Sequence, residues 1–168
     1  MDPLTAKVLK PELNPLFLTF ETIYRIEFPL YIKEIKFDEE ARKVDIFIEY
    51  HKKATFPCAC GQTGQKIHSR VPRVWRGLDI ANCQARLHLE VPRIKCANCG
   101  VKTYHAPWAR EHSHFSRLFE ERALFLAEYM PPSKVALFVG VNESQILRLL
   151  EQRGKTPKRL SPKSDEGA

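Results

Sequence analysis

The sequence reads Cys58-Ala59-Cys60-Gly61 and, after residues 62–95, Cys96-Ala97-Asn98-Cys99-Gly100. Structural zinc takes four sulfur or nitrogen ligands in a tetrahedron, and close cysteine pairs are a frequent source of them. A glycine after each pair allows the positive φ that turns both thiolates toward one ion. We therefore predict a closed structural zinc site whose four ligands are Cys58, Cys60, Cys96 and Cys99.

Other interpretations of the cysteines stay open. The pairs also fit reduced thiols without metal, a redox dithiol, or a mixed site in which His68 or His105 replaces one cysteine. The single residue between Cys58 and Cys60 is a less usual spacing than two. The fifth cysteine, Cys83, stands apart from both pairs and is expected to be a core or surface residue.

The chain shows neither a secretion signal nor a run of 18 apolar residues, so we expect no membrane span. The expected location is the cytoplasm. Clustered cysteines in a reducing compartment are more often metal ligands than disulfides, which favours the zinc interpretation.

The regions around the cysteines have the patterns of a sheet preceded by a helix. Helical spacing of apolar residues predicts a helix over residues 14–27, capped by Asn14 with Pro15 in its first turn. Alternating apolar and polar residues predict four strands, over residues 32–37, 44–50, 67–74 and 85–94. Pro72 and Pro92 indicate edge positions or bulges in the last two strands.

Positive charge is concentrated in the cysteine region. The 168-residue chain has 27 Lys and Arg against 20 Asp and Glu, a net charge of +7. Residues 58–110 hold nine of the basic side chains but only two acidic ones, Asp79 and Glu90, and so carry a net charge equal to that of the whole chain. Such a field suits a polyanion, although a solvated basic surface is the alternative. The residues expected to face phosphates are Arg70, Arg73, Arg76, Arg86, Arg93 and Lys95.

The C-terminal third is predicted to be helical. Three helices are expected, over residues 116–129, 133–140 and 143–153. The last two have the pattern of a helix-turn-helix, with the small Ala136 where the helices cross and Gly140 in the turn. The last helix would enter the major groove, with Ser144, Gln145 and Arg148 reading bases. The alternative is a helical hairpin that does not bind DNA, which the slightly acidic local charge favours.

The expected fold class is α+β, a small zinc-clasped antiparallel β domain followed by a helical helix-turn-helix domain. We expect four segments: an N-terminal helical arm, the zinc-binding β domain, the helix-turn-helix domain and a flexible basic tail. Their bounds are residues 1–30, 31–110, 111–153 and 154–168.

The order of these motifs resembles the N-terminal half of ISL3-family insertion-sequence transposases from bacteria. The resemblance covers roughly residues 30–152. It is carried by the segments Ile35-Lys36-Phe37-Asp38, Phe56-Pro57-Cys58-Ala59-Cys60-Gly61, Val74-Trp75-Arg76-Gly77-Leu78-Asp79, Val91-Pro92-Arg93-Ile94-Lys95-Cys96, Gly100-Val101-Lys102 and Ala106-Pro107-Trp108-Ala109-Arg110. In that family this half binds the terminal inverted repeats of the element, and a DDE-type catalytic domain follows. The resemblance thus implies a sequence-specific binder of double-stranded DNA.

The chain ends soon after the predicted helix-turn-helix, so we expect no strand-transfer activity, because two-metal chemistry needs carboxylates gathered on a larger scaffold. A second copy of the chain and a full-length transposase are further expected partners. The alternative function is a zinc-stabilised module that binds a protein or RNA.

Overall fold

The computed structural model describes residues 7–9 and 14–154. The chain forms two compact units, Met1–Leu118 and Phe119–Ala168. The predicted tail over 154–168 lies, apart from Gly154, outside the described residues. The α+β fold class is confirmed, since a sheet with a cysteine cluster is followed by helices.

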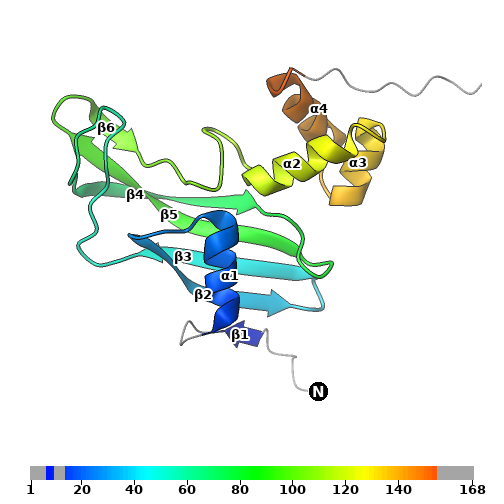
Figure 1. Ribbon diagram of the computed structural model, residues 1–168, viewed down its shortest axis with the longest axis horizontal. Coiled ribbons are helices and arrows are strands. Elements are labelled where there is room, and N and C mark those ends of the chain that lie inside the picture. Colours follow the sequence, from blue (N-terminus) through cyan, green and yellow to red (C-terminus); the bar gives the residue numbers. More distant parts are fainter. Residues whose placement is uncertain (1–6, 10–13, 155–168) are drawn as a thin grey trace, which may run out of the picture. The chain divides into compact units, whose positions relative to one another are not determined.

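The first unit is built on a six-stranded sheet (Figure 1). Its strands are β1 (Lys7–Leu9), β2 (Leu30–Asp38), β3 (Lys43–Tyr50), β4 (Ile67–Arg76), β5 (Gln84–Cys96) and β6 (Gly100–Thr103). The order across the sheet is β1-β2-β3-β5-β4, and β6 pairs with β5. The four predicted strands are all present as β2 to β5, each close to its expected bounds.

One strand pair departs from the predicted antiparallel sheet. β3 and β5 run parallel, with Lys43 opposite Gln84 and Ile48 opposite Leu89. The chain leaves β3, forms β4 on the outer edge of the sheet and returns along β5 beside β3. A parallel pair needs a long connection, and residues 51–83 supply one that includes a whole strand and the first cysteine pair.

The two strand prolines occupy places where a missing N–H is tolerated. Pro72 lies on β4, which is an edge strand, as predicted. Pro92 lies on the central strand β5, in the short gap between two of the strands that pair with β5. The pairing with β3 ends at Leu89, and the pairing with β6 begins at Arg93. The strand therefore has a local edge at Pro92 although it is central elsewhere.

The helix α1 (Pro15–Tyr24) lies across one face of the sheet (Figure 1). It begins as predicted, with the Asn14 side chain accepting a hydrogen bond of 3.0 Å from the Leu16 N–H. Phe17, Phe20 and Tyr24 are buried in one core with the sheet residues. The segment predicted as an N-terminal arm thus contributes its helix to the core of the first unit.

The second unit contains most of α2 (Arg117–Leu126) together with α3 (Pro132–Val139) and α4 (Glu143–Gln152). The three helices correspond to the three that were predicted. Among the residues that the structure describes, no helix is both long and apolar enough to cross a membrane.

Candidate metal centre and nucleic-acid interface

The first cysteine pair lies in a tight turn before β4. The Gly61 N–H donates to the Cys58 carbonyl at 2.9 Å, and the Cys58 N–H donates to the Gln62 carbonyl at 2.8 Å. Gly61 has φ of +91°, the left-handed conformation expected there. This turn directs two thiols separated by one residue to the same side, so the unusual spacing is compatible with a shared ion.

The second pair forms the tip of the β5–β6 hairpin. Cys96 pairs with Gly100 across the hairpin, and Cys99 lies in the turn between them. Gly100 has φ of +71° and completes the turn. The two pairs, far apart in sequence, are brought together because β5 returns beside the loop that follows β3.

The four thiols converge on one point. The sulfur atoms of Cys58, Cys60, Cys96 and Cys99 all lie within 4.8 Å of one another. The Cys60 and Cys96 sulfurs are 3.6 Å apart. A tetrahedral ion with zinc–sulfur bonds of ~2.3 Å requires sulfurs about 3.8 Å apart, so the cluster fits zinc.

Hydrogen bonds shift the pKa values of two of the thiols in opposite directions. The Gln62 backbone N–H, followed by the neighbouring thiols, lowers the pKa of Cys60 to about 7. Hydrogen bonding to Cys60 and then Cys58 favours the protonated Cys99 thiol and raises its pKa to about 12. Zinc would bind all four cysteines as thiolates and take the place of these protons. With four sulfur ligands the tetrahedron is closed, so the role of zinc is structural.

The helix-turn-helix of the second unit has its predicted geometry. Val135, Ala136 and Val139 of α3 are buried, as are Ile146 and Leu149 of α4. Gly140 ends α3 with φ of +68°. The two helices therefore pack through these apolar side chains, with the predicted Ala136 among them, around the predicted glycine turn.

The three predicted base-reading residues have different surroundings on α4. Ser144 and Arg148 are exposed. Gln145 is half-buried, and its side-chain oxygen accepts a hydrogen bond of 3.0 Å from the Asn142 N–H. The Gln145 oxygen is thus engaged in capping α4. The sequence signal for this role was an Asn followed three residues later by Gln.

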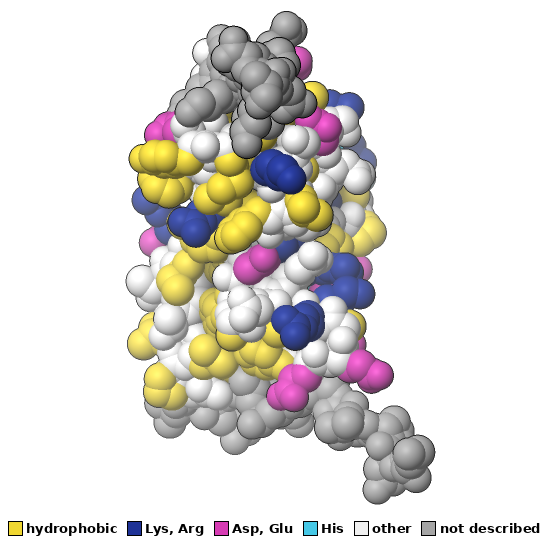
Figure 2. Space-filling model, turned by 90° about the vertical axis from the view of Figure 1, so that its right-hand side faces the viewer, with side chains coloured by type: hydrophobic (Ala, Val, Ile, Leu, Met, Phe, Trp, Pro, Cys, Tyr) yellow, Lys and Arg dark blue, Asp and Glu magenta, His cyan; other side chains and the backbone are white. Residues whose placement is uncertain are grey.

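Apolar side chains are also exposed on the second unit. Phe125, Tyr129, Leu137 and Phe138 have exposed fractions between 49% and 77%. In the view of Figure 2, exposed apolar side chains lie among basic and acidic ones.

The six basic residues predicted to face phosphates do not form one surface. The Arg76 guanidinium pairs with Asp79 and donates to the Gly77 carbonyl at 2.6 Å, so it holds the loop after β4. Arg70 donates to the Tyr50 hydroxyl at 2.5 Å. Arg86 is half-buried, whereas Arg73, Arg93 and Lys95 are exposed.

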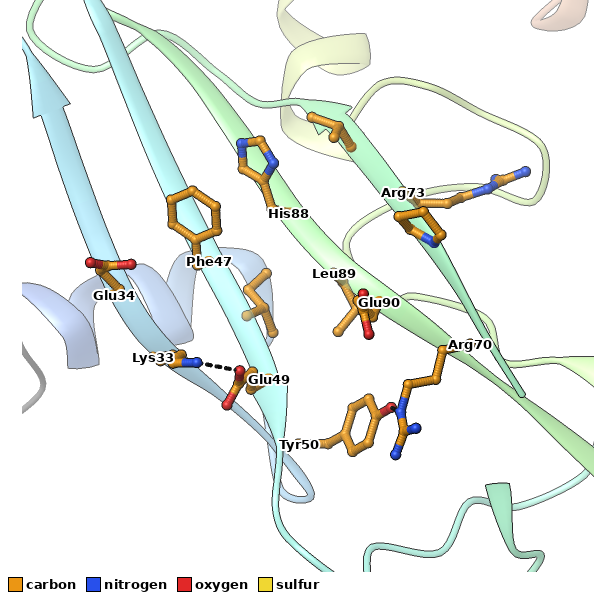
Figure 3. Close-up of a pocket in the computed structure, with 13 residues that line it drawn as sticks. Lys33, Glu34, Phe47, Glu49, Tyr50, Arg70, Arg73, His88, Leu89 and Glu90 are labelled. Atoms are coloured by element: carbon orange, nitrogen blue, oxygen red, sulfur yellow. Dashed lines mark hydrogen bonds and ion pairs between the residues drawn. The ribbon is translucent and has the colours of Figure 1, made fainter. Parts of the chain in front are cut away.

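A groove of about 540 Å³ lies where β3 and β5 separate beyond their last paired residues (Figure 3). Figure 3 shows the Arg70 side chain reaching Tyr50 across this groove, while the Arg73 side chain points away from it. Glu34, Glu49 and Glu90 also line the groove. No local sequence pattern signals this groove, because it depends on the parallel pairing of β3 and β5.

A zinc-clasped sheet joined to a helix-turn-helix defines a class of DNA-binding modules. Comparison with protein-family models narrows the class. Residues 58–99 match the zinc-finger of transposases IS204/IS1001/IS1096/IS1165, and residues 105–154 match the helix-turn-helix domain of transposase family ISL3. The chain therefore carries the zinc-finger and helix-turn-helix segments of ISL3-family transposases, as its motifs predicted. Both segments indicate DNA binding.

Curated relatives are longer proteins. The chain is 25% identical over 114 residues to the "Transposase for insertion sequence element IS1557" of Mycobacterium tuberculosis, in strains CDC 1551 / Oshkosh and ATCC 25618 / H37Rv. The match covers 64% of this chain and 26% of each relative. No solved structure matches the chain.

Proposed function

We propose that the chain is a zinc-dependent, sequence-specific DNA-binding fragment of a transposase that binds the terminal inverted repeats of an insertion element. The observation that carries this proposal is the combination of a four-cysteine zinc site with a helix-turn-helix whose last helix exposes Ser144 and Arg148. Zinc would fix the sheet, and α4 would supply base contacts in the major groove.

We further propose that the chain has no strand-transfer activity of its own. It would act in the bacterial cytoplasm, where its DNA target lies. Its occupancy of an element end would compete with a full-length transposase. A second copy of the chain is a further proposed partner, because inverted repeats present the same site twice.

The test is a mobility-shift titration with a duplex that carries an element end and a duplex of the same composition in scrambled order. We expect tighter binding to the element end. Arg148→Ala should reduce this preference by about 1–3 kcal/mol, the range for one good base contact. Arg122→Ala is the matched control, since it removes the same charge from an exposed position on α2. Equal preference in the wild type and Arg148→Ala would contradict the placement of α4.

A second candidate function is a protein-interaction module. The exposed Leu137 and Phe138 of α3 favour it, because neighbouring exposed apolar side chains often mark protein interfaces. Salt dependence separates the two functions. A DNA binder shows a steep fall of the binding constant with salt concentration, whereas binding through apolar side chains shows little.

A further inference from the structure

The β4–β5–β6 region carries basic side chains on both of its faces. Residues directly opposite in neighbouring strands share a face. Arg73 is opposite Leu89, and Arg93 is opposite both Ser69 and Thr103. Because side chains alternate along a strand, Arg93 and Lys95 of β5 lie on the face of Leu89, and so does Arg73. Three exposed basic side chains therefore share one face of the sheet, which we call the Arg73 face.

The opposite face contains the groove of Figure 3, whose lining holds Glu34, Glu49 and Glu90 beside Lys33 and Arg70. Lys33 of this groove pairs with Glu49 at 2.6 Å. Arg70 shares the groove lining with Glu90, which lies opposite Pro72 on the same face. A phosphodiester placed there would meet carboxylates as well as cations, so this face is poorly suited to DNA.

A smaller pocket of about 140 Å³ opens on the Arg73 face. Arg73, Thr103, His105 and Arg110 contribute polar groups to it, in each case from the first unit. Its apolar lining includes Trp75, Val91, Ala106 and Ala109. The pocket thus combines cationic and hydroxyl donors with an apolar wall.

Acidic groups are scarce around this pocket. Its lining contains one carboxylate, Glu111, whose exposed side chain lies 3.6 Å from the exposed His112. Among the residues that the structure describes, Arg73 has no carboxylate within ion-pair distance. Its guanidinium is therefore available to an anion, and guanidinium groups match phosphate oxygens in a two-pronged geometry.

We propose that this pocket receives a backbone phosphate of duplex DNA, bound by Arg73 and His105, and that Arg93 and Lys95 contact the adjoining phosphates. The apolar wall accommodates the deoxyribose beside the bound phosphate. The inference rests on the proposed function, because it places the DNA backbone on one face of the zinc unit. It assigns no base readout to the pocket, since phosphate contacts fix position without reading sequence.

The experiment measures how the binding constant for a mixed-sequence duplex of about 30 base pairs, near three helical turns, depends on salt. The wild type is compared with the double variant Arg73→Gln/Arg93→Gln. The matched control is Lys33→Gln/Lys36→Gln, which removes the same charge from β2, outside the Arg73 face. Zinc content and the urea unfolding midpoint establish that both variants are folded.

We expect the pocket variant to lower the log–log slope by about 1.8, since each lost phosphate contact removes ~0.9. The control should keep the slope of the wild type. Equal losses in both variants, or an unchanged slope in the pocket variant, would overturn the proposal. Wild-type protein whose binding does not change with salt would instead overturn the proposed DNA-binding function, so the two failures are distinguishable.

Discussion

Replacing one zinc ligand tests most directly how much the four-cysteine site stabilises the first unit. In Cys96→Ser the ion loses a ligand that connects the β5–β6 hairpin to the turn at residues 58–61. We expect zinc content to fall from one ion per chain to none. The sheet unit then loses a cross-link between positions that are 36 residues apart in sequence.

The size of the effect follows from the entropy of closing that loop. By the relation used for disulfides, a cross-link over about 36 residues contributes about 4 kcal/mol at 25 °C. Domain stabilities are ~5–15 kcal/mol, so this is a large fraction of the total. With a urea slope of about 1.5 kcal/mol per molar, the unfolding midpoint should fall by about 2–3 M.

The assay is a urea titration followed by tryptophan fluorescence. Both tryptophans, Trp75 and Trp108, are buried in the first unit with ring centroids 5.4 Å apart, so the signal reports on the unit that holds the cluster. Cys83→Ser is the matched control, since Cys83 lies in a separate turn with Ile80. If Cys96→Ser kept its zinc and unfolded at the same urea concentration as Cys83→Ser, the cross-link would be refuted.

Three further predictions concern buried groups of the two units. A methyl group at Gly77 would lie 2.7 Å from the Tyr24 hydroxyl and 2.8 Å from a Leu87 methyl, so Gly77→Ala should lower the free energy of unfolding by about 1–3 kcal/mol in urea titrations. Tyr24→Phe should recover part of this loss, because it removes the nearest atom. Burial raises the pKa of Tyr24 from 10.0 to about 12. The unfolded chain therefore loses this proton first, and the free energy of unfolding should fall by about 2 kcal/mol between pH 10 and 12. A urea series over this range should show the fall in the wild type, and an equal fall in Tyr24→Phe would contradict it. Arg153 donates to the fully buried Glu120 carboxylate at 3.1 Å, so Arg153→Met should lower the stability of the helical unit by about 1–3 kcal/mol in thermal unfolding followed by circular dichroism. Glu120→Gln in the Arg153→Met background should restore part of that loss, whereas no restoration would argue against the Arg153–Glu120 ion pair as its cause.

The elements and the metal ligands were predictable because their signals are local. A cysteine pair in a turn, a glycine at the end of α3 and an alternating strand each reflect chemistry within a few residues. The capping role of Asn14 was predictable for the same reason.

The surroundings of individual side chains were less predictable. Arg76 and Arg93 are the same residue type, and both were predicted to face phosphates. Arg76 instead holds a loop through Asp79, whereas Arg93 is exposed on β5. Glu120 is charged and fully buried, and its partner Arg153 is distant in sequence. Such differences depend on which chain segments meet, and a local pattern does not contain that information.

The amino-acid order predicts a four-cysteine centre, a basic middle segment and a helix-turn-helix, because residue type and spacing carry those signals. It does not predict that β3 and β5 pair in parallel or that the basic residues are divided between two faces. These features depend on the register of the sheet. A strand's neighbours fix which side chains share a face, and those neighbours are chosen by packing across the whole unit.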